Sequence, residues 1–284
     1  MTRKPIRIMA YNILEGFLDR EGALDKRRLD AARAIVAEID PDVLVLNEAL
    51  HCRPGIDGKH HDYAAWFNYP HVADSTYDGG RWGNAVLSKH PILSTREFSI
   101  HNRSGIVISI RKGRGKALSV ATYHPHPSRR PANKAADFAG LINGVSGPCV
   151  VCGDFNSINP EDSPNLDVLS LGFTAFTPPG HERASAARFI DGGEAVFEAL
   201  AALGYRDAVP PHRRAPTMPT PFAAQPGAGP NDPSAMRIDH FVANELVRTI
   251  DGGVLRTPLS ETASDHFPVW LDVLTIPETT RSHP

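Results

Sequence analysis

The chain has 284 residues and 41% of them are apolar, so it can bury a sizeable core. Lysine and arginine number 30 against 32 aspartates and glutamates, which excludes the strongly basic surface of a general nucleic-acid-binding domain. Three cysteines are too few for a disulfide framework, so we expect a reducing, cytoplasmic environment. No apolar run has the length of a membrane span or of a signal peptide, and we expect neither.

The N-terminal part of the chain predicts a strand, a helix and a second strand. A short apolar run over residues 6–12 indicates a buried strand. Residues 27–39 have apolar positions at helical spacing, with Asp25 placed to cap the start and Pro41 to enforce the end. Residues 43–46 indicate a fully buried strand. This order with short connections predicts an α/β layered fold.

The remainder of the chain continues the alternation. Five further apolar runs predict strands over residues 84–88, 106–110, 117–123, 149–152 and 238–243. We expect the second and third of these to form a hairpin around the basic turn of residues 111–116. Helices are predicted over residues 133–143 and 194–203, the second closed by Gly204 in the left-handed conformation.

Two segments predict irregular structure. Residues 51–82 are rich in histidine and glycine and indicate surface loops with one short helix. Residues 209–233 are rich in proline and contain little that could pack, so we expect a loop with a restricted backbone. Because a strand resumes near residue 238, we interpret this loop as an insertion in a single domain that spans residues 1–284.

Carboxylate and amide side chains follow two of the predicted strands. Glu48 ends a strand of valine and leucine, where burial would be costly unless a cation or a donor meets it; the alternative is that it emerges into solvent. The alternation of Asp154, Phe155 and Asn156 directs both polar side chains to one side. An Asp-x-Asn sequence also forms ordinary turns.

Imidazole and acidic groups lie at other strand ends. His124 follows one predicted strand, Asp239 begins another, and Asp265 and His266 precede a third. A histidine that acts as a base or as a phosphate donor needs an orienting partner, and an acid on a neighbouring strand supplies one. One such strand end is usually structural, but several in one chain indicate a shared site.

These signatures together resemble those of the endonuclease/exonuclease/phosphatase superfamily, in order and in rough spacing. The matching residues are Tyr11-Asn12, Asn47-Glu48, Gly83 to Ser88, His124, Gly153 to Ser157, Arg237 to Asp239 and Ser264 to Pro268. The resemblance covers nearly the whole chain. It implies a four-layer α/β sandwich of two mixed β-sheets packed face to face with helices outside, and an active site at one end of the sheets.

The resemblance also implies a metal-dependent phosphoester hydrolase of the nuclease, phosphodiesterase or phosphatase type. Glu48 is expected to bind Mg²⁺, for which Mn²⁺ is a possible substitute, with Asn12 and Asp265 in or next to the ligand shell. Asn12 is also expected among the catalytic residues. Asp154 would position or deprotonate the attacking water. Carboxylate and amide oxygens are the ligands that Mg²⁺ prefers, and phosphoryl transfer mainly needs positioning and charge neutralisation.

The resemblance assigns the phosphoryl oxygens to nitrogen donors. Asn156, His124 and His266 would hold these oxygens, and Asp239 would orient His266 and keep it charged. Arg129 follows His124 closely and could reach a second phosphate or a leaving group. The alternative is an ordinary exposed arginine.

Two positions depart from the family pattern. Abasic-site endonucleases carry an acidic residue two positions after the first asparagine, where this chain has Leu14, with Glu15 one position further. Asn47 stands where many relatives have glutamine. A second carboxylate ligand therefore stays open, and abasic-site specificity is not carried over.

Other interpretations remain. The chain could be a catalytically silent protein of the same fold that binds phospho-ligands, or a zinc-dependent hydrolase that uses its histidines, such as His60, His61 and His126. Cys149 and Cys152 have the spacing of a redox pair, but on a buried strand they point to opposite faces, which favours core packing.

The substrate class is open between nucleic acid, a small phosphoester and a lipid headgroup. The near-neutral charge and the proline-rich loop favour a restricted substrate that is not a duplex. No protein partner is implied.

Overall fold

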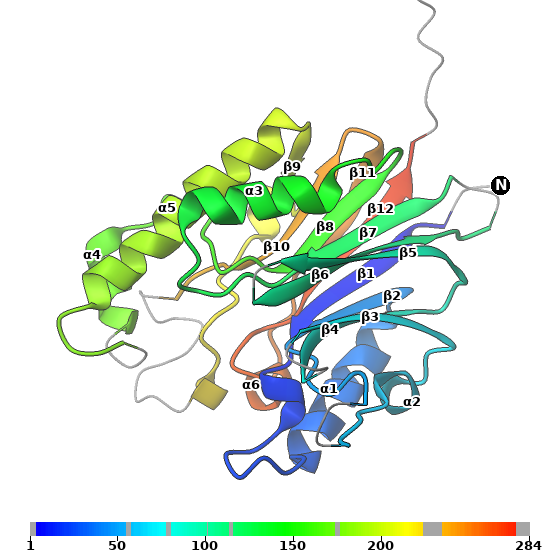
Figure 1. Ribbon diagram of the computed structural model, residues 1–284, viewed down its shortest axis with the longest axis horizontal. Coiled ribbons are helices and arrows are strands. Elements are labelled where there is room, and N and C mark those ends of the chain that lie inside the picture. The colour runs from blue at the N-terminus through cyan, green and yellow to red at the C-terminus, as the bar shows by residue number, and fades with distance from the viewer. Residues whose placement is uncertain are drawn as a thin grey trace, which may run out of the picture.

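Two six-stranded mixed β-sheets form the centre of the computed structural model (Figure 1). The structure describes residues 4–54, 58–77, 81–100, 102–113, 116–173, 177–223 and 235–276. The first sheet consists, in order, of β11 (Val247–Val254), β12 (Val269–Thr275), β1 (Ile6–Asn12), β2 (Val43–Asn47), β4 (Trp82–Ser88) and β3 (His71–Tyr77). The second consists of β5 (Ile92–Ile100), β6 (Arg103–Ile110), β7 (Leu118–Tyr123), β8 (Cys149–Asp154), β10 (Asp239–Asn244) and β9 (Tyr205–Asp207).

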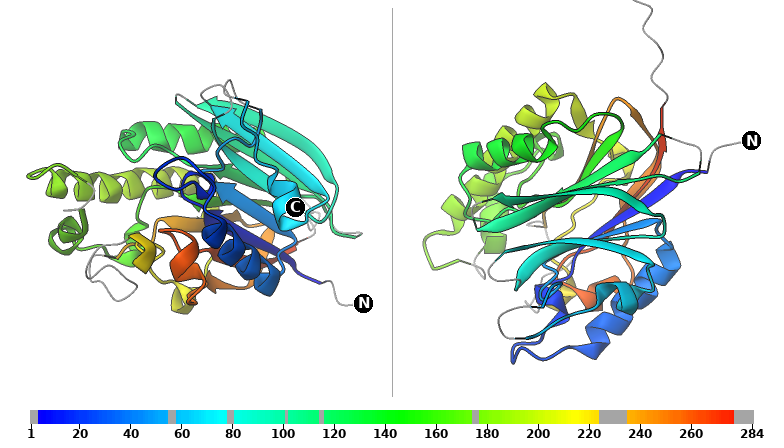
Figure 2. Two further views of the ribbon diagram at one scale, coloured as in Figure 1. Left: turned by 90° about the horizontal axis from the view of Figure 1, so that it is seen from below. Right: turned by 45° about the vertical axis from the view of Figure 1, so that its right-hand side comes forward.

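Helices cover the outer faces of both sheets (Figure 2). The helices are α1 (Lys26–Ile39), α2 (Tyr63–Phe67), α3 (Pro131–Ile142), α4 (Leu166–Gly172), α5 (Glu182–Ala202) and α6 (Ser260–Ala263). α1 and α2 pack on the first sheet, and α3 and α5 pack on the second. Because apolar side chains also fill the space between the sheets, β2 and β8 are buried along their whole length. The predicted four-layer α/β sandwich is confirmed.

The residues predicted to start and to end helix α1 do so in the structure. The Asp25 side chain accepts a hydrogen bond from the backbone N–H of Arg28, and the helix ends at Asp40 in the left-handed conformation, directly before Pro41. The hairpin of β6 and β7 is also confirmed, although Arg114 and Gly115 of its turn lie outside the described residues. None of the helices within the described residues has both the length and the apolarity that crossing a membrane requires.

Several elements differ from the expectations. The segment predicted as loops over residues 51–82 contains β3, which is missed because its sequence is polar and it forms an edge of the sheet; residues 55–57 and 78–80 lie outside the described part. β5, one of the two edge strands of the second sheet, is missed for the same reason.

Helix α5 begins at Glu182, well before the predicted start at residue 194. Gly192 and Gly193 lie inside it and obscure the helical pattern. A Cβ atom at Gly193 would lie 1.7 Å from the carbonyl oxygen of Ile158, so close packing requires this glycine.

Strand direction brings the polar signatures together. β1 and β2 are parallel, with Asn12 opposite Asn47, so both strands end on the same edge. β8 and β10 are antiparallel, with Asp154 opposite Asp239, so the end of one strand meets the start of the other. Because the two sheets face each other, these ends lie at one end of the sandwich (Figure 1).

Candidate active site at one end of the sheets

Asp154 is the most connected carboxylate at this end of the molecule. It is 2% exposed; its Oδ1 accepts the backbone N–H of Asn156 at 2.7 Å, and its Oδ2 accepts the Asn12 amide at 3.0 Å. The same Oδ2 lies 3.2 Å from Nε2 of His124. Burial alone would raise the pKa of Asp154, but the charges of His124 and His266 and the bond from Asn156 outweigh it and hold the pKa well below its ordinary value. Asp154 is therefore an anion throughout the neutral range.

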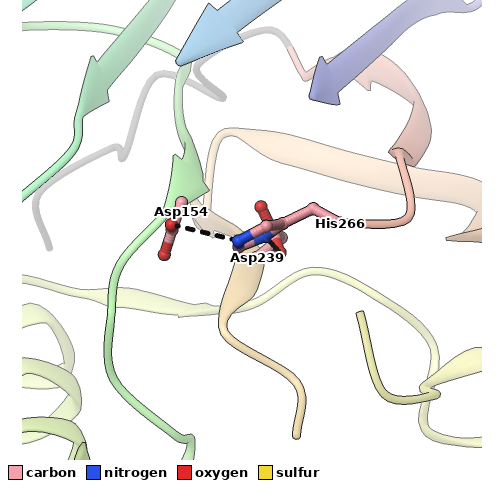
Figure 3. A group of neighbouring side chains, drawn as sticks. All are labelled: Asp154, Asp239 and His266. Atoms are coloured by element: carbon pink, nitrogen blue, oxygen red, sulfur yellow. Dashed lines mark hydrogen bonds and ion pairs between the residues drawn. The ribbon is translucent and has the colours of Figure 1, made fainter. Parts of the chain in front are cut away.

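His266 and Asp239 form a buried pair. Nδ1 of His266 lies 2.7 Å from Oδ2 of Asp239, while Nε2 lies 3.8 Å from Oδ2 of Asp154, too far for a direct hydrogen bond (Figure 3). Burial disfavours the charged imidazole, but the negative charges of Asp239, Asp265 and Asp154 outweigh it and raise the pKa of His266 well above 6.5. His266 is thus a cation at neutral pH, with its Nε2–H on the side of Asp154.

Asn12, Glu48 and Asp265 form an oxygen-rich group beside Asp154. The Asn12 amide donates to Oε1 of Glu48 at 3.2 Å, and its Oδ1 accepts the backbone N–H of Leu14 at 3.0 Å. The backbone N–H of Glu15 donates to Oε2 of Glu48 at 2.9 Å. Burial raises the pKa of Asp265, and the negative charge of Glu48 raises it further against the opposing charge of His266. These two carboxylates repel each other, which a cation between them would relieve.

Asn156 and His124 line a cavity next to Asp154. Nδ2 of Asn156 lies 2.9 Å from Nε2 of His124 and donates to the carbonyl of Pro125 at 2.9 Å. Asn156 has a φ of 45°, a left-handed conformation that needs support from its surroundings. The structure therefore brings together eight of the predicted site residues: Asn12, Glu48, His124, Asp154, Asn156, Asp239, Asp265 and His266.

Unlike its neighbour Glu48, Asn47 forms hydrogen bonds to residues of both sheets. Its amide nitrogen donates to Oδ1 of Asn84 at 2.7 Å and to Oγ1 of Thr122 at 3.0 Å, and its Oδ1 accepts the backbone N–H of Asp154 at 2.9 Å. Gly153 makes this approach possible, because a Cβ atom there would lie 2.3 Å from Oδ1 of Asn47. Asn47 thus links the two sheets directly behind the site.

Arg129 is not brought into this cluster. Its Nε and Nη2 donate to the two carboxylate oxygens of Asp137 at 2.8 and 2.9 Å, and Asp137 also accepts the Tyr123 hydroxyl at 2.9 Å. The expected contact of Arg129 with phosphate is therefore not supported by its placement, because a nearby carboxylate engages its whole guanidinium fork.

Two other arginines line the cavity instead. The cavity has a volume of about 470 Å³ and a largely apolar wall. Its walls include Leu14, Trp82, Phe173, Phe189, Met218 and Met236, together with the cations Arg103 and Arg188. In the part of the chain that the structure describes, no carboxylate pairs with Arg188. Nothing in the sequence distinguishes this exposed arginine from others.

The proline-rich loop supports the site, contrary to the expectation that it packs little. Thr217 and Thr220 are fully buried in the part up to Ala223 that the structure describes; residues 224–233 lie outside it. The backbone N–H of Phe267 donates to the carbonyl of Thr217 at 2.7 Å, and that of Thr220 donates to the carbonyl of Asp265 at 3.0 Å. The loop thus holds the segment that carries Asp265 and His266. No local sequence signal reveals this, since both contacts are long-range.

The weaker motifs have structural explanations. Cys149 and Cys152 are free and fully buried, and they lie in different apolar cores on opposite faces of β8, which confirms core packing. Among the described residues, the potential ligands that cluster in a group of three are Asp154, Asp239 and His266, and no histidine-rich group forms. His60 and His61 are therefore not part of a described ligand cluster.

The donor set fits a hard divalent cation. Four carboxylates converge here, Glu48, Asp154, Asp239 and Asp265, and the charge of His266 balances only part of theirs, so a bound cation would lower the repulsion of an approaching phosphate anion. The buried group of Asp154, Asp239 and His266 could hold a metal ion, although its imidazole is already paired. The carboxylates of Glu48 and Asp265 offer oxygen donors, which suits Mg²⁺ better than zinc. The Asn12 amide turns its nitrogen to Glu48 and its Oδ1 to the backbone N–H of Leu14.

Comparison with known proteins agrees with this geometry. A model of the Endonuclease/Exonuclease/phosphatase family matches residues 9–266. The chain therefore belongs to the endonuclease/exonuclease/phosphatase family, whose members act on phosphoesters and generally depend on a divalent metal.

Individual relatives are distant. Uncharacterized protein YbhP of Escherichia coli (strain K12) is 29% identical over 170 residues, which cover 53% of this chain and 66%, just under two thirds, of YbhP. An endonuclease/exonuclease/phosphatase from Beutenbergia cavernae superposes with a TM-score of 0.68 at 20% identity, covering 96% of this chain and 72% of that one. The human Nocturnin catalytic domain with bound sulfate anion gives 0.58 at 16% identity, covering 96% of each chain. These structures share the fold.

Proposed function

We propose that the chain is a Mg²⁺-dependent phosphoester hydrolase that cleaves a P–O bond by in-line attack of water. The main support is that two groups of side chains lie side by side, with Asp154 between them. One group consists of the oxygen donors Glu48 and Asp265, and the other of the nitrogen donors Asn156, His124 and His266. A metal ligand group next to an anion-binding group is what phosphoryl transfer requires. We also propose that residues 1–284 act as one catalytic domain, since the two sheets draw strands from Ile6 to Thr275.

Glu48, Asp265 and Asn12 would hold the metal ion. When bound there, Mg²⁺, or Mn²⁺ in its place, supplies positive charge to the phosphoryl group and the leaving oxygen. The Asn12 amide nitrogen donates hydrogen bonds to both Glu48 and Asp154 and so fixes the distance between these carboxylates. The backbone N–H of Glu15 donates to Glu48 and orients it.

Asp154 positions the attacking water. Its low pKa makes it a weak base but a constant hydrogen-bond acceptor, so it orients the water more than it deprotonates it. Charged His266, together with Asn156 and His124, donates to the phosphoryl oxygens, and Asp239 holds His266 in the required orientation.

We propose a compact phosphoester as substrate in preference to duplex nucleic acid. The cavity wall is mostly apolar and offers the two arginines Arg103 and Arg188, a combination suited to one planar or apolar group that carries its own negative charge. A duplex needs an extended basic groove, whereas the chain has a formal charge of −2. The human Nocturnin catalytic domain, which shares this fold, is described with a bound sulfate, a tetrahedral anion like the phosphoryl group proposed here.

Hydrolysis of bis(p-nitrophenyl) phosphate with Mg²⁺ tests the proposal. We expect turnover by the purified chain and loss of about a thousandfold in kcat for Asp154→Asn, because the water loses its orienting anion. Asp137→Asn is the matched control, since Asp137 pairs with Arg129 outside the cavity. Equal activity of Asp154→Asn and wild type would contradict the mechanism. Phosphate binding without turnover by wild type would instead support the silent binding protein.

A further inference from the structure

Lys134 is a buried cation directly beneath the Asn156 turn. It lies on α3 with 0% exposure, and its Nζ is 2.5 Å from the carbonyl oxygen of Asn156 and 3.4 Å from Oγ of Ser157. Within the described residues, no carboxylate forms an ion pair with this ammonium group. The negative charge that acts on it is that of Asp154, which lies on the other side of the turn. An unpaired buried ammonium is costly, so its retention calls for an explanation.

The packing around Lys134 is built to hold the extended side chain. It shares the buried face of α3 with Phe138, Leu141 and Ile142, where an apolar residue would fit the helical pattern. Nζ lies 5.3 Å from the centre of the Phe189 ring on α5. A Cβ atom at Gly192 would lie 3.4 Å from Nζ and 3.1 Å from Oγ of Ser157, so the glycine leaves space for both groups.

The turn above Lys134 is held at two successive carbonyls. Lys134 donates to the carbonyl of Asn156, and Nε2 of His240 lies 2.9 Å from the carbonyl of Ser157. Burial lowers the pKa of His240 to about 3, so this imidazole is neutral and contributes no charge. Lys134 is therefore the group that brings positive charge to the back of the turn.

We propose that Lys134 is a positioning residue for phosphoryl binding: its ammonium group fixes Asn156 in its left-handed conformation and places a positive charge behind the Asn156 amide. The inference rests on the proposed function, because it takes Asn156 as a donor to the phosphoryl group. A charge in a low-dielectric site acts over several ångströms, so it stabilises an anion that it does not touch.

The charge of Lys134 depends on pH, so the pH dependence of anion binding is a second test of its role. Burial, opposed by the negative charge of Asp154 and assisted by the positive charge of Arg188, lowers the pKa of Lys134 to about 8. The charged groups that act on it are Asp154 from β8 and Arg188 from α5, and the titratable group on the next carbonyl of the turn, His240 from β10, is neutral. Lys134 is thus charged at neutral pH and loses its proton in the mildly alkaline range.

Three substitutions separate charge from hydrogen bonding. Lys134→Met removes both, Lys134→Gln keeps a donor for the Asn156 carbonyl but no charge, and Lys134→Arg keeps the charge. Lys112→Met is the matched control, because Lys112 is a half-buried lysine whose ammonium group donates to the carbonyl of Pro5 and to Asp42. Lys112 follows the C-terminal end of β6, whereas Arg103 of the cavity wall lies at the other end of this strand. Folding of each variant is checked by circular dichroism and thermal unfolding.

The affinity for sulfate is measured by calorimetry from pH 7 to 9, where the charge of sulfate does not change, and kcat and KM are measured with bis(p-nitrophenyl) phosphate. We expect the methionine and glutamine variants to bind sulfate about tenfold more weakly and to lose about thirtyfold in kcat/KM, with arginine restoring most of both. Wild-type affinity should fall through about pH 8, and this fall should be absent in the glutamine variant.

The outcomes distinguish the two claims. If the glutamine variant folds, binds sulfate as tightly as wild type and hydrolyses the ester as fast, the proposed role of Lys134 is wrong, whatever the methionine variant does. Sulfate binding that depends on Lys134 in a protein that hydrolyses no ester would support this role and overturn the proposed function. A similar loss of affinity in Lys112→Met would also overturn the inference, because the effect would then be general destabilisation.

Discussion

The hydroxyl oxygen of Thr217 accepts a hydrogen bond from the backbone N–H of Asp239 at 3.2 Å, and another from that of Ile238 at 3.1 Å. The carbonyl of the same threonine accepts the backbone N–H of Phe267 at 2.7 Å. One residue of the proline-rich loop thus fixes the backbone next to both members of the pair of Asp239 and His266. The orientation of the imidazole therefore depends on a segment far from it in sequence.

Thr217→Val should weaken both the fold and the reaction. The substitution leaves two buried N–H groups without an acceptor, and we expect a loss of about 1–3 kcal/mol in the free energy of unfolding. Because Asp239 then loses its fixed position, kcat/KM should fall about tenfold. Urea unfolding and steady-state kinetics measure the two effects. Thr217→Ser keeps the hydroxyl and should behave like wild type; a serine variant as impaired as the valine variant would refute this reading.

Asp239→Asn should change the pH dependence of the reaction. Asp239 helps to raise the pKa of His266, so the substitution lowers this pKa and the imidazole loses its charge at lower pH. We expect the alkaline limb of the kcat profile to move toward neutral pH and activity at pH 8 to fall about a hundredfold. A profile with an unchanged alkaline limb would show that His266 does not act as the charged donor.

Stability should depend on pH with opposite signs for two groups of the site. The folded pKa of His266 lies above its unfolded value of about 6.5, so its contribution is complete below that value and is lost as pH rises through the folded pKa. The folded pKa of Asp154 is lowered, so its contribution is present above its unfolded value and is lost as pH falls through the folded pKa. Urea unfolding of His266→Gln should lack the alkaline loss, and that of Asp154→Asn should lack the acid loss. Unchanged curves in both variants would contradict these assignments.

Metal binding should depend on Glu48 and not on the side chain of Glu15. Mg²⁺ at about a hundred times its Kd should stabilise the wild-type fold by about 2.7 kcal/mol, measured as a shift in Tm, and chelation should abolish hydrolysis. Glu48→Gln should remove most of this shift. Glu15→Gln is the control, because Glu15 is exposed and reaches the site through its backbone N–H. A shift that persists in Glu48→Gln, or that vanishes in Glu15→Gln, would place the ion elsewhere.

Arg188 and Arg129 should differ in their effect on the substrate. Arg188→Gln removes a cation from the cavity wall and should raise KM about fivefold for a phosphoester with a second negative charge, with little change in kcat. The probes are the p-nitrophenyl ester of thymidine 5′-phosphate with and without a 3′-phosphate. Arg129→Gln breaks the pair with Asp137 and should lower stability by about 1 kcal/mol while KM stays unchanged. A larger KM effect in Arg129→Gln would restore the role inferred for it from sequence.

Much of the fold could be predicted because its signals are local. Apolar runs marked β1, β2, β8 and β10, and the cap at Asp25 with the stop at Pro41 marked α1. The edge strands β3 and β5 escaped, because strands at an edge are stabilised by backbone pairing with a neighbour more than by apolar side chains. Lys134 could have been noticed, since it occupies a position on the apolar face of its helix that the 3.6-residue period assigns to the core.

The sequence by itself determined which chemical groups end the strands, among them Glu48, Asp154 and His266, because the polar termination of an apolar run is a property of a few consecutive residues. Only the tertiary structure decided that Thr217 supports Asp239, that Arg129 turns to Asp137, and that the charge of Lys134 lies behind Asn156. Apart from the short-range pairing of Arg129, these relationships join residues distant in the chain. Packing selects such partners among many candidates of equal chemistry, and no local pattern records that selection.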